Sequence, residues 1–349
     1  MKKPMLNILQ YLVFLGLGIF FVWLSVKDIG HAEWLQIKDA IRRARHWMII
    51  PAFVLMFLAH YSRALRWKIL MEPLGYKPST FNTFAAVMIG YLVNAGVPRL
   101  GEVVKCTILA RYEKVRPDRL VGTIVMERAV DLVSLMVVFL AALLIEGAVI
   151  GEHVSALFGK FFSDQAGNTS ATKVILAVGG LVVFLGLVYF LLRRFGHINA
   201  VSKVKNILKG VFHGLSSIRF IRQRGAFIFH SVLIWALYLA STTIGLYALR
   251  ETAPLGIGGG LTTLAVGSVA MIVTPGGIGA YPLMVATLMK WYGLNEDTIG
   301  SALGWLLWSV QTLIILAGGL IFFALFSYFN KKRQVEAGKQ FTGQNIGAA

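Results

Sequence analysis

Long apolar runs separated by short polar segments dominate the chain and predict membrane-spanning helices. A spanning helix needs about 20 mostly apolar residues. We therefore predict an all-α polytopic membrane protein, with a single transmembrane domain over 1–330 and a polar, disordered tail over 331–349. Six segments reach or approach the spanning length: about 6–26, 47–62, 120–145, 173–192, 226–249 and 299–328.

Two further apolar segments, about 81–110 and 258–291, are broken in the middle. Proline and glycine interrupt helices, and each half has only roughly 12–16 residues, which is short for a crossing. We therefore predict two re-entrant helical hairpins, whose broken backbone must be buried in protein or line a wet cavity. The residues that break them are Pro98 and Gly101 in NAGVPRLGE, and Pro275, Gly276, Gly277 and Gly279 in TPGGIGAYP.

The basic residues of the loops predict the orientation of the chain in the membrane. If both broken segments are hairpins, the loops rich in lysine and arginine fall on one side and the poor loops on the other. Cytoplasmic loops carry the excess of lysine and arginine, so we expect a protein of the cell inner membrane with both termini cytoplasmic. The exception is 27–46, a basic segment placed outside, whose apolar residues recur at helical spacing. We interpret it as an amphipathic helix on the outer surface.

With this topology, the order span–hairpin–span occurs twice, in opposite orientations. Such a pattern is typical of an inverted repeat, and it predicts a binding site near the midplane between the two broken segments. The two breaks resemble each other only loosely in sequence. Two unrelated kinked helices are the alternative interpretation.

Composition supports a membrane protein and excludes several other classes. The chain is 57% hydrophobic and 14% charged, its net charge is +18, and its mean hydropathy is +0.70. Soluble domains carry about 25% charged residues. A nucleic-acid binding protein needs a soluble basic face, and we expect no nucleic-acid partner here. A single cysteine, Cys106, permits no disulfide within the chain, and the seven scattered histidines predict neither a metal site nor a cofactor.

Charged residues inside the predicted membrane segments mark the candidate site, because such residues are costly there. Arg99, Glu102 and Lys105 follow the first break, and Glu127, Arg128 and Asp131 share one face of the span 120–145. The six formal charges sum to zero. One interpretation is a salt-bridge network that holds the hairpin to the span. The other is a polar cavity for a charged lipid head group, in which an arginine fork matches phosphate oxygens and the half-helix after Pro98 offers a positive dipole end. Asn94, Arg63, Arg66 and Trp67 lie near the ends of neighbouring segments.

The loop 193–225 contains a basic amphipathic segment at 200–224. Its apolar residues recur at intervals of three and four, with lysine and arginine between them. This pattern favours an interfacial helix on anionic lipid or a docking face for a cytoplasmic partner. A helix that packs under the bundle is the alternative.

Four motifs together resemble the transmembrane region of lysylphosphatidylglycerol synthases, a flippase-like domain also found alone in many bacterial and archaeal proteins. They are RALRW (Arg63, Arg66, Trp67), NAGVPRLGE with Lys105, ERAVD (Glu127, Arg128, Asp131) and PGGIG (Pro275 to Gly279). The resemblance covers about 1–330 and implies a role in moving a lipid between leaflets. Family members often carry a glutamate shortly after PGGxG, where this chain has Ala280, Tyr281 and Pro282. Few residues follow Phe326, so we expect no aminoacyltransferase domain.

The sequence thus predicts a protein, not an enzyme, that binds and translocates a phospholipid or a related lipid such as a polyprenyl phosphate. No ATP-binding loop of the G-x-x-x-x-G-K type is present, so motion is expected to be downhill or coupled to an ion through Glu102, Glu127 or Asp131. An accessory subunit that presents a lipid to a cytoplasmic transferase is the second hypothesis. A membrane-embedded lipid-modifying enzyme is the third.

Overall fold

The computed structural model describes residues 16, 19–24, 26, 27, 29–97, 99–152 and 221–346, with side chains up to Asn330 except those of Asp118 and Ser327. These residues contain helices and no strand, which confirms the all-α prediction. Within them, five stretches are long and apolar enough to cross a membrane: His46–Leu74, Arg119–Ile145, Arg224–Leu246, Ala253–Val273 and Glu296–Asn330. The chain is therefore a multi-pass membrane protein.

Four of these stretches correspond to predicted spans. The predicted span 6–26 is described only in part, and the predicted span 173–192 lies outside the described residues. Most of the amphipathic segment 200–224 also lies outside them, as does Pro98. The disordered tail predicted for 331–349 stays a prediction.

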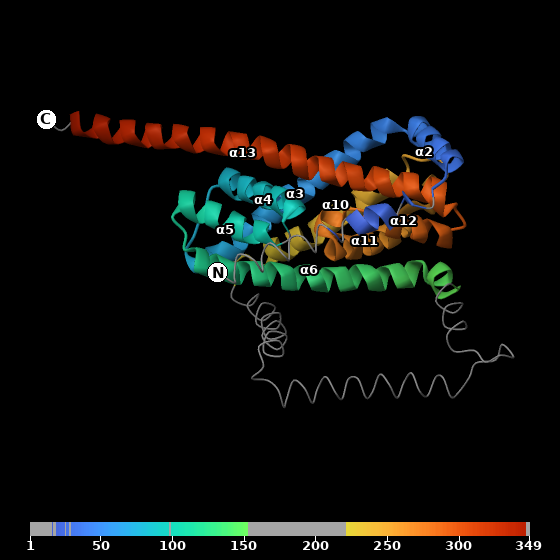
Figure 1. Ribbon diagram of the computed structural model, residues 1–349. Helices are drawn as coiled ribbons and strands as arrows, with labels where there is room; N and C mark the ends of the chain where they lie inside the picture. Colours follow the sequence, from blue (N-terminus) through green and yellow to red (C-terminus); the bar gives the residue numbers. More distant parts are fainter. Residues whose placement is uncertain are drawn as a thin grey trace, which may run out of the picture. The chain divides into compact units, whose positions relative to one another are not determined.

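The chain divides into two compact units, one formed by Met1–Ile124 with Arg219–Ala349 and the other by Val125–Ile218. Most of α6 (Pro117–Ile145) belongs to the second unit. The first unit contains α2 (His31–Arg43), α3 (Ile49–Met71), α4 (Thr80–Gly96), α5 (Leu100–Glu113), α10 (Arg224–Leu246), α11 (Gly256–Val273), α12 (Ala280–Trp291) and α13 (Ser301–Ile346) (Figure 1).

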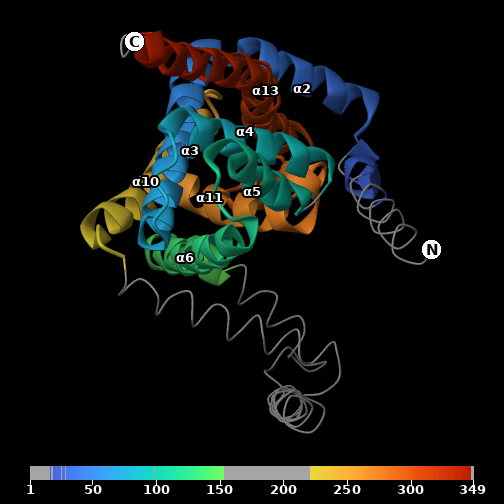
Figure 2. The ribbon, with the colours of Figure 1, turned by 90° about the vertical axis from the view of Figure 1, so that its left-hand side faces the viewer.

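Helices α3 and α10 pack side by side in antiparallel directions (Figure 2). The Ser241 hydroxyl on α10 donates to the carbonyl of Ala52 over 2.8 Å, near the start of α3. Further along α3, the hydroxyl of Ser62 lies 2.9 Å from Nδ1 of His230. Small and polar residues at this interface let the two helices approach closely and bond to each other, as in other membrane bundles.

The first broken segment forms a hairpin of α4 and α5, as predicted. Ser79 caps α4, because its side chain accepts a hydrogen bond from the backbone N–H of Asn82 over 3.1 Å. At the open end of the hairpin, buried Asn82 exchanges two amide hydrogen bonds, of 3.1 and 3.0 Å, with Asn330 on α13. Asn82 also donates to Glu113 at the end of α5. This network joins α4, α5 and α13.

The second broken segment also forms a hairpin, from α11 and α12. Helix α12 has 12 residues, but α11 has 18 and is longer than the predicted half-helix. The helix begins at Gly256, two residues before the predicted segment 258–291. A Cβ on Gly260 would overlap the side chain of Thr243 on α10. The missing side chain therefore allows α11 and α10 to pack closely.

Helix α13 runs past both hairpins and packs on one arm of each (Figure 1). Near its start, Gly304 lies against the backbone of Pro282 on α12. About four turns further along, Gly318 and Gly319 lie against Met88 and Leu92 on α4. The open end of the first hairpin, at Asn82, meets Asn330, whereas Ala286, towards the open end of the second, meets Gly300 just before α13. The two hairpins therefore enter the unit from opposite ends.

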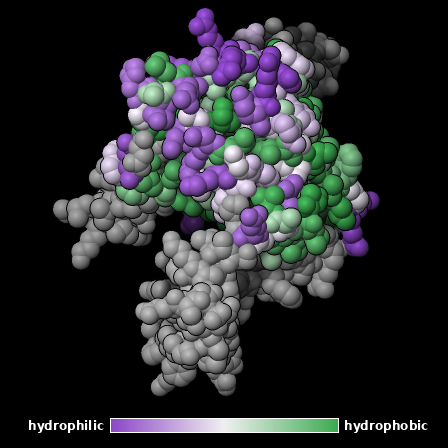
Figure 3. All heavy atoms as spheres, turned by 90° about the vertical axis from the view of Figure 1, so that its right-hand side faces the viewer, coloured by the Kyte–Doolittle hydropathy of each residue, from purple (hydrophilic) through white to green (hydrophobic). Residues whose placement is uncertain are grey.

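The predicted amphipathic helix of 27–46 is α2. Its inner residues Ile37 and Ala40 are buried against α13 and the π-helix Glu296–Gly300, while Trp34 and Trp47 stay exposed. Its basic residues are exposed, and hydrophilic side chains gather around this helix in Figure 3. The predicted apolar stripe therefore serves partly to pack α2 on the protein. Its position on the outer membrane surface stays a prediction.

Candidate functional site

The first break is closed by Asn94. Helix α4 ends at Gly96 and α5 begins at Leu100, with Arg99 at the N-cap in the left-handed conformation (φ 66°). Asn94 Oδ1 accepts a hydrogen bond of 2.8 Å from the backbone N–H of Gly101. The first N–H groups of a helix have no partner within that helix, so Asn94 satisfies one of them from the opposite arm. We predicted Asn94 as a cavity residue, and in this structure it holds the hairpin together.

Gly101 lets the two arms of the first hairpin meet. A Cβ at this position would overlap the carbonyl oxygen of Gly90 and lie 2.7 Å from the side chain of Asn94. Any other residue would force the arms apart at the level of the break. The predicted break residue Gly101 thus acts through close backbone approach.

The second break turns through glycines in left-handed conformations. Pro275–Gly277 forms a short 3₁₀ turn, and Gly276, Gly277 and Gly279 have φ values of 58°, 71° and 69°. Side chains rarely adopt such angles, which explains the choice of glycine. The indole N–H of Trp308 on α13 donates to the carbonyl of Gly276 over 2.9 Å. A Cβ on Gly279 would overlap the backbone of Phe21 and Val22. The helical residues 19–24 therefore contact this break.

The tips of the two hairpins meet. We call residues 94–99 the first tip and residues 274–279 the second tip. A Cβ built on Gly276 of the second tip would lie 3.8 Å from Cα of Ala95 in the first tip. Helix α4 also packs against the turn Pro275–Gly277 more broadly. The two breaks predicted from proline and glycine are therefore brought together, as the inverted-repeat prediction requires.

Three cationic side chains are buried next to the first hairpin. Arg63 and Arg66 on α3 are 6% and 0% exposed, and Lys105 on α5 is 5% exposed. Lys105 Nζ lies 4.6 Å from the ring centroid of Trp67, a cation–π distance. The Trp67 indole N–H in turn donates to the Thr123 hydroxyl over 2.8 Å. The sequence placed these residues in two separate groups, and the structure brings them together.

Partners on α10 hold the two arginines. Arg66 Nη1 lies 3.5 Å from the hydroxyl of Ser231, and Arg63 Nη2 lies 3.4 Å from the hydroxyl of Tyr238. Neither α10 residue was predicted as part of the site. The only signal in the sequence was their polarity within an apolar span, which many packing residues share.

Arg99 differs from these buried cations. Its side chain is exposed at the first tip, and no hydrogen bond or ion pair is found for its guanidinium among the residues that the structure describes. Glu102, one turn further along, is half-buried. Arg99 is therefore the cation of the first tip that is accessible to a ligand.

The second predicted charge cluster lies on α6, in the other unit. Arg128 lies between two acids, 3.5 Å from Glu127 and 3.7 Å from Asp131. Glu127 is 1% exposed, Asp131 14% and Arg128 45%. The helical spacing thus brings the three charges together on α6. Their neutralisation by the charges of the first hairpin stays a prediction.

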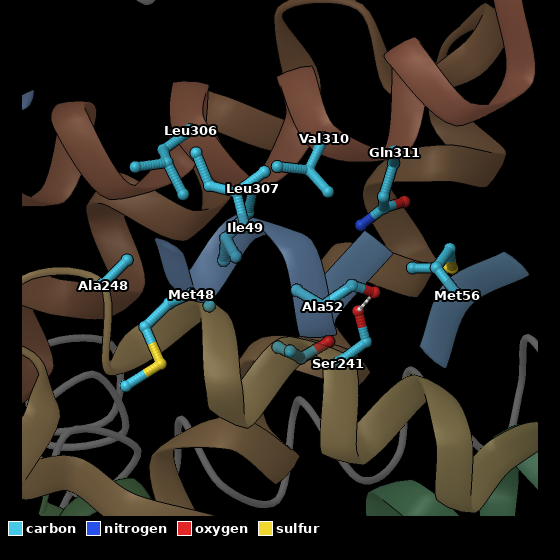
Figure 4. A pocket seen from close by; sticks show the side chains of 12 residues that line it. Met48, Ile49, Ala52, Met56, Ser241, Ala248, Leu306, Leu307, Val310 and Gln311 are labelled. Carbon is cyan, nitrogen blue, oxygen red and sulfur yellow. Dashed lines mark hydrogen bonds between the residues drawn. The ribbon is translucent and has the colours of Figure 1, made fainter. Parts of the chain in front are cut away.

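A small cavity lies between α3, α10 and α13 (Figure 4). The space open to the centre of a water molecule is about 10 Å³, which suits a single water and is too small for a lipid head group. Its lining is mostly apolar, with Ser241, Thr242 and Gln311 as polar members. Figure 4 shows Gln311 reaching from α13 towards the α3 side.

Comparisons with known proteins place this site in a family context. A family model described as the lysylphosphatidylglycerol synthase TM region matches residues 7–330, which include every predicted site residue. The chain is 22% identical over 314 residues to a UPF0104 membrane protein of Methanothermobacter thermautotrophicus, covering 83% of this chain and 88% of the relative. It is 30% identical over 86 residues to a UPF0104 membrane protein of Methanocaldococcus jannaschii, covering 24% and 26%. No solved structure matches the chain.

Proposed function

Because the chain belongs to the family of the lysylphosphatidylglycerol synthase transmembrane region, we propose that it binds a phospholipid or related lipid and moves it between the leaflets. A polyprenyl phosphate is within this class. The protein acts in this proposal as a transporter of the inner membrane, with both termini cytoplasmic and without catalysing a reaction.

The observation that carries the proposal is the meeting of the two hairpin tips. Two broken segments that enter from opposite ends and touch near Ala95 and Gly276 are the arrangement that transporters use for a midplane site. Irregular backbone at membrane depth is tolerated where it is buried or lines a cavity. Separation of the tips would open a polar path through the first unit, and their contact closes it.

The cations of the first hairpin supply the chemistry for a phosphate head group. Arg99 stands exposed at the N-terminus of α5, where the helix dipole also favours an anion. Lys105 on α5 is buried, as are Arg63 and Arg66 on the neighbouring helix α3. In this mechanism, Arg99 receives the phosphate while the acyl tails stay in lipid. Motion is downhill or coupled to an ion through Glu102, Glu127 or Asp131.

Replacing Arg99 by glycine is expected to slow the exchange of phosphate lipids about tenfold. A hydrogen bond to a charged group contributes about 1.5–3 kcal/mol, and 1.4 kcal/mol corresponds to a factor of ten. Glycine suits the left-handed backbone at this position, so Arg99→Gly should fold as well as the wild type. The measurement is leaflet exchange of labelled phosphatidylglycerol in liposomes.

Lys114→Gly is the matched control. Lys114 is also basic, exposed and left-handed (φ 55°), but it lies at the far end of α5 from the tip. It should exchange lipid at the wild-type rate. If both variants exchange lipid equally fast, Arg99 does not hold the head group.

A further inference from the structure

Polar aromatic side chains gather around Tyr238 at the interface of α3, α4 and α10. The ring of His60 on α3 lies 6.2 Å from that of Tyr238 and 4.9 Å from that of Tyr91 on α4. The ring of Trp235, one turn before Tyr238 on α10, lies 6.1 Å from it. Arg63 reaches the Tyr238 hydroxyl at 3.4 Å. We call His60, Arg63, Tyr91, Trp235 and Tyr238 the Tyr238 cluster.

Outside Arg63, whose guanidinium reaches Tyr238, two buried nitrogen atoms in this cluster have no hydrogen-bond partner within the described part of the chain. They are Nδ1 of His60, a residue only 6% exposed, and the indole Nε1 of Trp235. Buried polar groups normally find a partner, and each exception calls for an explanation such as a ligand or a water. Neither residue was a predicted site residue.

The chemistry of the cluster indicates which partner is needed. An indole N–H is only a donor, a guanidinium has five donors and no acceptor, and a tyrosine hydroxyl can donate. A neutral His60 ring has one donor and one acceptor nitrogen, so donors outnumber acceptors in the cluster and a further acceptor is needed. An anionic oxygen is the acceptor that best suits an arginine inside a membrane, because it also balances the charge.

We propose that the Tyr238 cluster binds the phosphate of a lipid head group at a second position, which is more buried within the protein than Arg99. This inference rests on the proposed function and specifies where the head group goes after the first tip. Arg63 supplies the charge, and Trp235 and Tyr238 supply neutral donors. His60, Arg63 and Arg66 follow one another at intervals of three residues on α3, so they form successive steps over about 9 Å of membrane depth.

The first hairpin connects this site to the tip. The ring of Tyr91 lies beside that of His60 in a tilted arrangement. Tyr91 is on α4, three residues before Asn94, which closes the hairpin. Residues three apart share a face of a helix. Movement of α4 that opens the tip therefore also moves Tyr91 away from His60 and uncovers the cluster.

The test measures binding and does not depend on transport. The full chain is purified in detergent, and its thermal unfolding midpoint is titrated with short-chain phosphatidylglycerol, with diacylglycerol and with inorganic phosphate. Wild-type protein is expected to be stabilised by phosphatidylglycerol and not by diacylglycerol, since a ligand that binds only the folded state stabilises it. Stabilisation by inorganic phosphate as well would show that the phosphate group alone suffices. If inorganic phosphate does not stabilise the protein, the acyl chains are required as well. Both results support a phosphate site.

Trp235→Phe and Tyr238→Phe each remove one donor and keep the ring, and each is expected to raise the Kd for phosphatidylglycerol about tenfold. Trp305→Phe is the matched control, because the Trp305 indole N–H is also buried without a partner in the described residues but lies against Trp308 on α13. Trp305→Phe should bind like the wild type. Equal affinity in all three variants would overturn the proposed site. That result would not contradict the proposed transport, because lipid exchange is measured separately.

Discussion

Locking the two hairpin tips together is expected to stop lipid exchange completely. The double variant Ala95→Cys and Gly276→Cys, in a Cys106→Ala background, places two thiols where a Cβ on residue 276 lies 3.8 Å from Cα of residue 95. Disulfides form when the two Cβ atoms are about 3.5–4.5 Å apart, and a Cβ this close to the other residue's Cα brings the two thiols within reach of each other. Oxidation should then hold the tips in their closed contact. Exchange in liposomes should fall to the rate of protein-free liposomes and return after reduction.

The physical reason is that the closed conformation offers no passage. The described cavity between α3, α10 and α13 has room for only a single water, and Lys105, the other cation near the first tip, is buried. A head group can pass only if the tips part. Because a side chain at position 276 strains the left-handed backbone, each single-cysteine variant is compared with itself, and it should exchange lipid equally fast before and after the same oxidant. If the oxidised double variant still exchanges lipid at the full rate, lipid takes another route.

Replacing Gly101 by alanine is expected to destabilise the protein by about 3 kcal/mol. The added methyl group would overlap the carbonyl oxygen of Gly90, a backbone atom that cannot rotate away. Overpacking of this kind costs about 1–3 kcal/mol and sometimes more. The shift would also weaken the hydrogen bond from the Gly101 N–H to Asn94. Thermal unfolding in detergent, supported by titration with a denaturing detergent, measures the loss.

Gly122→Ala is the control for this prediction. Gly122 lies inside α6, and a Cβ there would meet nothing within 4 Å. Alanine is a better helix former than glycine by up to about 1 kcal/mol, so this variant should be as stable as the wild type or more stable. If Gly101→Ala is equally stable, the close approach of the two arms does not hold the first hairpin together.

The hairpins could be predicted because their breaks depend on local sequence. Proline and glycine within apolar runs predicted both turns, and the short halves predicted that the chain reverses. The meeting of the tips followed from the topology alone. The start of α11 was predicted two residues too late, because Gly256 and Ile257 are already helical. Its close packing on α10 at Gly260 was not predicted, because no local pattern reports such a contact.

The candidate site was predicted only in part, for a related reason. Charged residues inside a predicted membrane segment, such as Lys105, stand out in the sequence, whereas Arg66 was found near the end of a span and in the RALRW motif. Asn94 was found too, but its hydrogen bond across the hairpin to Gly101 depends on the fold. His60, Trp235 and Tyr238 were missed because aromatic and polar residues in a span are common packing residues. They become notable only when α3, α4 and α10 bring them to one place.

Leaflet exchange by the wild-type protein alone decides whether this chain transports lipid. The protein is reconstituted in liposomes, and exchange is measured for neutral, anionic, aminoacylated and polyprenyl-phosphate lipids against protein-free liposomes. The account predicts accelerated exchange of at least one phosphate lipid and no acceleration for diacylglycerol. Exchange of every lipid at the protein-free rate would contradict transport by this chain. It would favour an accessory protein that presents a lipid to a cytoplasmic transferase.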